Sequence, residues 1–303
     1  MDPEGVNDSE VERVMPNLKV AIASGKGGTG KTLISTNLFH VLQLYGYDST
    51  LVDCDAEEPN DMIFFNRDLK KSIKIGHHVP VIDTDKCVFC GKCREYCSYN
   101  AIFIIPHAGI IKVIEDQCHS CGACIVACES GAIKEKEIEL GEVHVYTTPS
   151  KIIESMMRPG IASPVKIIKT AVKEAGSHGI IILDSPPGTS CPFIHTVMNA
   201  DHVVLVTEPT PFGLSDLKQS VETLKTMNKS CSVILNRVGI GNNEVYKYLE
   251  DENIPIVMEI PFDRVIAGYY TNGELVVNHS PEIRDQFLAM IKSIIEKYGN
   301  SNY

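Results

Sequence analysis

The chain has 303 residues, 44% of them hydrophobic and 22% charged, which is ordinary for a soluble globular protein and allows one large domain or two smaller ones. A formal net charge of -11 excludes a general affinity for nucleic acid or anionic membranes. No apolar run approaches the roughly 20 residues that span a bilayer, and the polar, acidic start lacks the apolar core of a signal peptide. We therefore expect a cytoplasmic protein with no stable membrane association and a loose tail at residues 1–16.

The first expected elements are an apolar strand at residues 18–24, a glycine-rich loop, and a helix at residues 33–45. The loop, SGKGGTGKT, fits the phosphate-binding pattern of a glycine, four residues and then Gly-Lys-Thr. In this pattern backbone N–H groups surround the phosphates, the lysine reaches the terminal phosphates, and the threonine hydroxyl ligates Mg²⁺. The nucleotide-binding residues predicted here are Gly25, Lys26, Gly27, Gly28, Thr29, Gly30, Lys31 and Thr32.

Strands and helices continue to alternate along the rest of the chain. Further strands are expected at residues 49–54, 180–184, 202–207, 231–236 and 254–260. Helices are expected at residues 214–227 and 243–252, from Ser163-Pro164 onward, and from Ser280-Pro281 to about Tyr298. This alternation predicts an α/β fold with a mostly parallel sheet covered by helices on both faces. Ligands of such sheets bind beyond the carboxyl ends of the strands, where Asp55, Asp184 and Asn236 fall.

Eight of the eleven cysteines lie between Cys87 and Cys128, in two copies of one pattern. Each copy has the spacing C-x2-C-x2-C-x3-C of bacterial two-cluster ferredoxins, in which the fourth cysteine of one copy serves the other cluster. The pattern predicts one [4Fe–4S] cluster on Cys87, Cys90, Cys93 and Cys128, and a second on Cys97, Cys118, Cys121 and Cys124. Structural zinc is the alternative, because paired CxxC units also suit tetrahedral sites. The third and fourth cysteines of each copy favour iron–sulfur.

Strand-like pieces at residues 78–83, 101–106, 110–115 and 142–146 border the cysteines. They predict a small α+β unit of bacterial ferredoxin type at residues 76–146, inserted into a nucleotide-binding domain formed by residues 17–75 and 147–303. Gly91 and Gly122 would permit the tight turn of each copy. Because the insert follows Asp55, a change of nucleotide could alter the exposure of the clusters.

The sequence KGGTGKT resembles the deviant Walker A loop of the P-loop ATPases that include MinD, ParA, the Mrp-type carriers and the nitrogenase iron protein. The resemblance implies that Lys26 is the signature lysine, which reaches across an ATP-bound dimer to the partner's nucleotide. The alternative is a solvated surface lysine. A nucleotide-dependent homodimer follows, in which Mg²⁺, Lys31 and Lys26 supply the charge neutralisation for ATP hydrolysis to ADP.

Other segments resemble further parts of this family. Asp53-Cys54-Asp55 is similar to switch I, which implies that Asp55 orients the attacking water. Asp184-Ser185-Pro186-Pro187-Gly188 is similar to switch II, which implies that Asp184 holds Mg²⁺ and that Gly188 senses the γ-phosphate. The residues expected around Mg²⁺ are Thr32, Asp55 and Asp184, and those of switch II are Asp184, Pro187 and Gly188. Asn236 and Arg237 resemble the adenine-binding pair, and Pro261-Phe262-Asp263 resembles the loop over the base, although Asp263 could equally be a helix N-cap.

Three cysteines lie outside the two copies. Cys191 resembles the place where the nitrogenase iron protein carries a ligand of its intersubunit cluster. That protein needs two such cysteines in each subunit, and no other cysteine lies between Ser130 and Ser190. We therefore expect Cys191 to be a buried thiol. Cys54 and Cys231 fall in apolar strands and are expected in the core.

Three functions remain open at this stage. The protein could couple ATP turnover to electron transfer through its clusters to a redox partner, which the eight-cysteine pattern and the absence of a C-terminal CxxC favour. It could instead build or carry iron–sulfur or other metal cofactors for an assembly partner. In the third case it is a MinD-like positioning ATPase whose ferredoxin unit is a docking domain. The mixed charges of the last helix predict packing against the sheet and not a membrane anchor.

Overall fold

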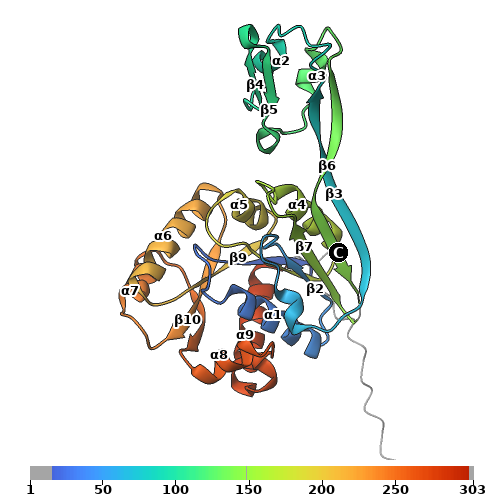
Figure 1. Ribbon diagram of the computed structural model, residues 1–303. Coiled ribbons are helices and arrows are strands. Elements are labelled where there is room, and N and C mark those ends of the chain that lie inside the picture. The colour runs from blue at the N-terminus through green and yellow to red at the C-terminus, as the bar shows by residue number, and fades with distance from the viewer. Residues whose placement is uncertain (1–15, 148, 300–303) are drawn as a thin grey trace, which may run out of the picture.

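The computed structural model describes residues 16–147 and 149–299, so the expected tail at residues 1–16 lies outside the described residues except for Pro16. Figure 1 shows a rounded body, a two-stranded stalk and a small head at the far end of the stalk. Among the described residues, none of the helices has the length and apolar character that crossing a bilayer requires.

A nine-stranded sheet forms the centre of the body, in the order β11-β10-β9-β1-β8-β2-β7-β6-β3. Neighbouring strands from β11 to β7 run parallel, whereas β6 is antiparallel to both β7 and β3. The strands are β1 (Leu18–Ala23), β2 (Ser49–Asp53), β3 (Leu69–Ile82), β6 (Ile133–Tyr146), β7 (Lys151–Met157), β8 (Ile180–Asp184), β9 (His202–Thr207), β10 (Cys231–Val238) and β11 (Ile256–Pro261). The mostly parallel sheet is confirmed, while β7, residues 69–77 of β3 and residues 133–141 of β6 are not among the predicted strands.

Helices cover both faces of this sheet, as predicted. One face carries α1 (Lys31–Leu44), α8 (Arg264–Thr271), α9 (Pro281–Tyr298) and the short 3-10 segments η1 (Asp61–Phe64) and η4 (Val276–Asn278). The other carries α4 (Val165–Ala175), α5 (Cys191–Met198), α6 (Pro211–Thr226) and α7 (Glu244–Asp251). Helix α9 buries Phe287, Ile291 and Ile294, so its apolar side packs inward. Helix α6 begins three residues before its predicted start, because Thr210 caps it through the Gly213 N–H at 3.0 Å.

The stalk is the outer part of the β3–β6 ribbon. These strands pair from Leu69 and Tyr146 to Ile82 and Ile133, but β6 pairs with β7 only between Gly141 and Tyr146. Beyond Gly141 the ribbon leaves the sheet. A side chain at Gly141 would place its Cβ 2.0 Å from the Met156 carbonyl oxygen, so this crossing point requires glycine. The predicted insert of residues 76–146 therefore includes residues 141–146, which lie in the main sheet.

The head contains the two cysteine copies. Its elements are α2 (Lys92–Glu95), β4 (Ile102–Ile105), η2 (Pro106–Ala108), β5 (Ile110–Val113), η3 (Glu115–Gln117) and α3 (Ala123–Val126). The copies have the same local backbone, since positive φ angles recur at matching positions: Phe89 and Ser120, Gly91 and Gly122, Asn100 and Gly131. Strands β4 and β5 form an antiparallel hairpin. The repeat in the sequence is thus also a repeat in structure.

Candidate nucleotide site and cysteine cavities

The phosphate loop joins the end of β1 to the start of α1, at the carboxyl edge of the parallel strands. Gly30 has φ 100°, and a Cβ there would lie 2.4 Å from Asn236 Nδ2. That amide donates a hydrogen bond of 2.8 Å to the Thr29 carbonyl, which fastens the loop to β10. A Cβ at Gly25 would lie 2.4 Å from the Asp216 carbonyl oxygen. These glycines let bare backbone pass close to its neighbours, the arrangement that leaves N–H groups free for phosphate.

The residues expected around Mg²⁺ meet beside this loop. Thr32 Oγ1 donates to Asp184 Oδ2 at 3.0 Å, and the Gly188 N–H donates to the Ser24 carbonyl at 3.1 Å. Lys31 is buried in the same region. Strand β2 ends next to β8, with Asp53 in register with Asp184, so Asp55 follows at the same edge. The structure therefore gathers the phosphate loop and both switch segments at one place.

Asp55 titrates far above an ordinary aspartate. Burial and, to a smaller extent, the charge of Asp184 raise its pKa to about 6, although the charge of Lys31 opposes both. In the nucleotide-free protein this carboxyl is therefore partly protonated slightly below neutral pH. A cation bound beside it would favour its ionised form.

Lys26 lies at the outer side of the loop. Its Nζ is 3.9 Å from the Asp216 carboxylate of α6, and the side chain is 34% exposed. A pair so long and so accessible holds the lysine weakly. The side chain therefore remains available to a partner that approaches the loop from outside.

All the residues predicted to contact the base line one cavity beside the phosphate loop. Its lining comprises Gly28, Gly30, Leu33, Asn236, Arg237, Pro261, Phe262, Asp263, Ile266, Ala267, Tyr270 and Thr271. Asp263 also caps α8, because its Oδ1 accepts the Val265 N–H at 2.8 Å. Arg237 pairs with Glu208 at 2.5 Å. Phe262 belongs to the segment predicted to lie over the base, and it lines the cavity. The sequence reasoning missed Ile266 and Tyr270, although the Pro-Phe-Asp cap followed by apolar residues at helical spacing could have indicated α8.

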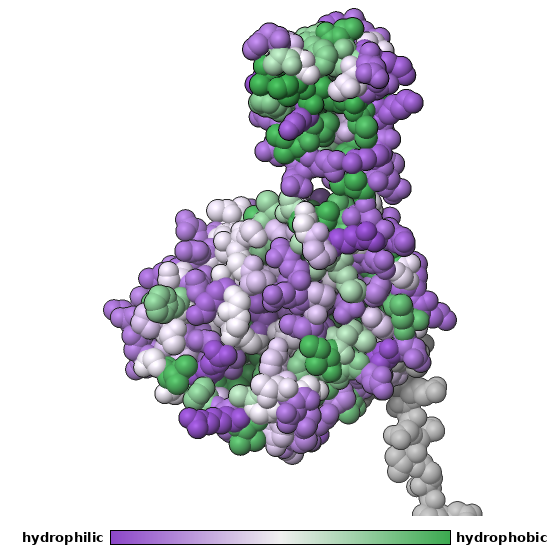
Figure 2. Space-filling view, in the orientation of Figure 1, coloured by the Kyte–Doolittle hydropathy of each residue, from purple (hydrophilic) through white to green (hydrophobic). Residues whose placement is uncertain are grey.

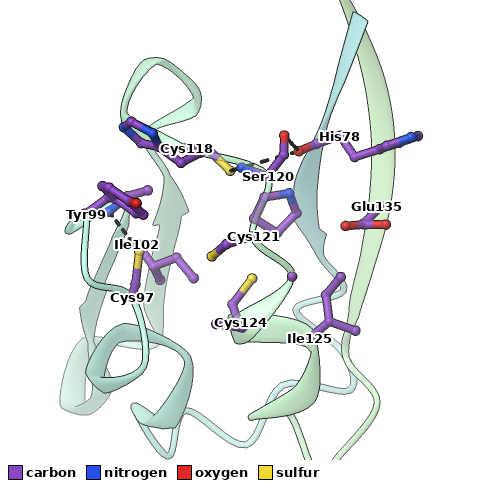
Figure 3. Close-up of a pocket in the computed structure, with 15 residues that line it drawn as sticks. His78, Cys97, Tyr99, Ile102, Cys118, Ser120, Cys121, Cys124, Ile125 and Glu135 are labelled. Carbon is purple, nitrogen blue, oxygen red and sulfur yellow. Dashed lines mark hydrogen bonds between the residues drawn. The ribbon is translucent and has the colours of Figure 1, made fainter.

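Two cavities in the head divide the eight cysteines into the predicted sets. Cys97, Cys118, Cys121 and Cys124 line the first, and Figure 3 shows their sulfurs facing a common space. Cys87, Cys90, Cys93 and Cys128 line the second. Each cavity thus takes three cysteines from one copy and the fourth from the other copy. The first cavity also borders on stalk residues, including His78 and Glu135, and the Ser120 hydroxyl donates to the His78 carbonyl at 2.6 Å.

Backbone N–H groups contact thiols of the first cavity. The Ala101 N–H donates to Cys97 Sγ at 3.3 Å, and the Ser120 N–H to Cys118 Sγ at 3.5 Å, contacts that would stabilise thiolates. Burial raises the pKa of Cys124 to about 11, so iron binding would release its proton. Nowhere in residues 16–147 and 149–299 do three or more histidine, cysteine or acidic side chains gather closely enough for a single metal ion. The thiols of each set surround a space instead, which suits a polynuclear cluster.

The expectation for Cys191 is wrong. This residue opens α5 and is exposed, whereas Phe193 and Val197 form the buried side of the helix. The helical period thus turns position 191 to solvent. Cys54 is buried as expected, and Cys231 is half-buried because it is the first residue of β10.

Comparison with known proteins places these features in context. The family model described as the CobQ/CobB/MinD/ParA nucleotide binding domain matches residues 20–276. Two uncharacterized proteins of Methanocaldococcus jannaschii are 31% and 32% identical over 271 and 285 residues, covering 86% and 92% of this chain and 92% and 96% of theirs. An iron–sulfur cluster carrier protein of Methanococcus maripaludis is 21% identical over 92% of this chain and 84% of its own.

The solved structures show the same fold. The septum site-determining protein MinD of Pyrococcus horikoshii, complexed with Mg-ADP, superposes with a TM-score of 0.55 at 18% identity, covering 91% of this chain and 95% of MinD. The McdA–ATP complex of Cyanothece also gives 0.55, at 14% identity, covering 92% of this chain and 97% of McdA. These similarities establish a MinD/ParA-like P-loop fold for the body.

Proposed function

We propose, since the chain belongs to the CobQ/CobB/MinD/ParA family of nucleotide-binding proteins, that it is an ATPase that builds or carries iron–sulfur or related metal cofactors for a partner protein. Its similarity to proteins named iron–sulfur cluster carriers, over 92% and 96% of this chain, supports assembly as the leading function. In this proposal residues 17–75 and 147–303 form the ATPase, and residues 76–146 form a ferredoxin-like insert.

The observation that carries the proposal is the division of eight cysteines between two cavities. Four thiols around one space are the donor set of a [4Fe–4S] cluster, and the crossed origin of the fourth thiol is the ferredoxin arrangement. The residues present therefore fit two such clusters. When bound, these clusters supply one-electron chemistry at low potential.

The geometry of the body supports the proposed nucleotide roles. Backbone N–H groups of the loop and Lys31 would bind the phosphates, while Thr32 and Asp184 hold Mg²⁺. Ionised Asp55 would orient the attacking water, and charge neutralisation would lower the barrier to hydrolysis. Lys26, held only by a 3.9 Å pair, would reach the nucleotide of a second copy, so that ATP favours a homodimer.

The path from nucleotide to head is short along the chain. Residues 54–68 connect the end of β2 to the start of β3, and β3 continues without interruption into the stalk. A switch segment that changes with bound nucleotide would therefore act on the root of the stalk. We infer that ATP and ADP states present the head differently to its partner.

Electron transfer to a redox partner is the second candidate function. The same crossed cysteine sets favour it, because a cluster bound between two copies of the repeat is anchored from both sides and suits a resident electron carrier. Figure 2 shows apolar patches on the surface of the head. Its exposed large apolar side chains include Val88 and Val126, at 69% and 85% exposure. Either kind of partner could dock there.

One anaerobic experiment separates the two functions. Protein reconstituted with iron and sulfide is mixed with an apo iron–sulfur enzyme, with ATP or ADP, while the iron on each protein is counted. ATP-dependent activation of the acceptor with loss of iron from this chain supports the carrier function. Retention of about eight irons, together with ATP-dependent reduction of an acceptor by clusters that were first reduced with dithionite, supports electron transfer. Zinc in place of iron overturns both, and a Lys31→Ala variant controls for nucleotide dependence.

A further inference from the structure

Asp61, the first residue of η1, is buried, and neither of its carboxylate oxygens has a hydrogen-bond partner among the described residues. The chain around it is folded tightly over Asp53. Asp53 Oδ2 accepts the N–H groups of Asn60 and Asp61 at 2.9 and 3.1 Å, and its Oδ1 accepts that of Asp55 at 3.0 Å. The turn that these bonds hold carries the Asp61 side chain inward. A buried carboxylate with no partner is costly, so its presence requires a cause.

The carboxylates nearest to Asp61 belong to the nucleotide site. Asp53 and Asp184 end adjacent strands in register, and the charges of both raise the pKa of Asp61, after burial as the main cause. Asp184 uses one oxygen to accept from Thr32, while its Oδ1 also has no partner in the described chain. Two neighbouring buried carboxylates thus present unsatisfied oxygens toward one region. Lys31 is the cation that lowers the pKa of Asp184.

We propose that Asp61 is part of the Mg²⁺ site, holding the ion directly or through one of its bound waters together with Thr32 and Asp184. This inference rests on the proposed nucleotide function. Mg²⁺ takes oxygen ligands and keeps several of its waters, so carboxylates beside its phosphate-bound face are suitable partners. The divalent cation supplies the missing positive charge, and the orphaned oxygens of Asp61 and Asp184 gain their partners.

As a positioning residue, Asp61 would connect the metal to the rest of the molecule. The Phe64 ring lies 5.2 Å from Tyr270, which lines the base cavity, and Phe65 contacts Phe39 of α1 edge-on at 5.4 Å. Strand β3 begins shortly afterward at Leu69. Segment η1 therefore contacts the metal site through its first residue and the base cavity through its last. Mg²⁺ fixes this segment, and the segment leads directly into the stalk.

The test compares Asp61→Asn with Glu58→Gln, an exposed carboxylate in the same segment. Calorimetry measures Mg²⁺ binding to each protein with a non-hydrolysable ATP analogue. Loss of an outer carboxylate at a metal site weakens metal binding by about 10- to 100-fold, so we expect at least ten-fold weaker Mg²⁺ binding for Asp61→Asn and no change for Glu58→Gln. Without Mg²⁺, Asp61→Asn should unfold at a higher temperature than the parent, because a neutral amide replaces a buried carboxyl group that has no hydrogen-bond partner among the described residues.

Asp61→Asn should thus weaken Mg²⁺ binding and yet raise the unfolding temperature of the Mg²⁺-free protein. This combination distinguishes a role in metal binding from a purely structural role. An Asp61→Asn protein that binds Mg²⁺ within two-fold of the parent overturns the inference alone. A parent chain that binds no Mg²⁺-nucleotide overturns the nucleotide function and this inference with it. Hydrogen exchange of the unmodified protein with the ATP analogue gives an independent test. Protection at residues 60–65 should increase when Mg²⁺ is added, and unchanged exchange there contradicts the assignment even if the variant fails to fold.

Discussion

Body and head are stabilised in different ways. Large apolar cores cover both faces of the nine-stranded sheet, whereas the buried core of the head consists of Cys93, Ile102, Cys124 and Ile133. A unit as small as the head buries too little apolar surface to be stable on that basis alone. Two of its four core residues are thiols that also line the cavities. The body can fold by apolar burial, whereas in the proposed function the stability of the head depends on the clusters that its cysteines bind.

Removal of iron should therefore have the largest effect, and should separate the two regions. Anaerobic chelation of the reconstituted protein is expected to abolish amide protection at residues 83–132, because metal binding there is also folding free energy. Strands β1 and β8 should keep their protection. Hydrogen exchange before and after chelation measures both. Equal protection of the head with and without iron would mean that the head folds without its clusters. The body and the head would then not differ in how they are stabilised.

Lys26→Ala tests whether the body acts as a dimer. The variant should lose dimerisation with ATP while nucleotide binding to the monomer stays nearly unchanged, since Lys31 and the loop glycines remain. Sedimentation with a non-hydrolysable analogue measures the association, and fluorescence of a labelled nucleotide measures binding. Lys292→Ala, an exposed lysine on α9, is the control. If Lys26→Ala still forms dimers with ATP, then Lys26 is a solvated surface lysine, as in the alternative interpretation.

The raised pKa of Asp55 predicts that ATP hydrolysis by the body depends on pH. Its raised pKa of about 6 means that the free protein holds it protonated below that pH, and only the ionised form can orient water. The kcat/KM for ATP should rise as pH increases through about 6, and Asp55→Asn should abolish turnover while leaving nucleotide bound. Glu57→Gln, an exposed neighbour, should keep the parent profile. A flat parent profile between about pH 5 and 7 contradicts the role.

The local pattern of the sequence was sufficient to predict the mostly parallel sheet and the phosphate loop. Apolar runs between helical segments identify buried strands, and the fixed cysteine spacing assigned all eight thiols to the sets that line the two cavities. Strand β7 was missed because it pairs with the stalk strand β6, a contact that no local period encodes. Asp61 was missed for a related reason: only the bonds to Asp53 fold the segment so that this carboxylate enters the site.

Gly141→Ala addresses the junction between the two regions. A Cβ at this position would meet the Met156 carbonyl oxygen at 2.0 Å and Ile167 Cδ1 at 2.7 Å, so β6 or β7 must shift. Overpacking of this kind costs about 1–3 kcal/mol, which chemical denaturation of the body should detect. Gly268→Ala, with open space around the added methyl, should be neutral or slightly stabilising. An unaffected Gly141→Ala protein would show that the junction is pliable.

Cys191→Ser should have the smallest effect. Its thiol is exposed at the start of α5, whereas the eight head cysteines account for both cavities. Iron content, nucleotide binding and ATP-dependent dimerisation are all expected to match the parent, because no cluster ligand and no buried contact is lost. The decisive measurement is the iron content of dimers that are isolated with the ATP analogue. Those dimers could hold more iron than the two heads bind, and Cys191→Ser could remove the excess. In that case a cluster is shared between the two bodies, and cysteine ligands are not confined to the head.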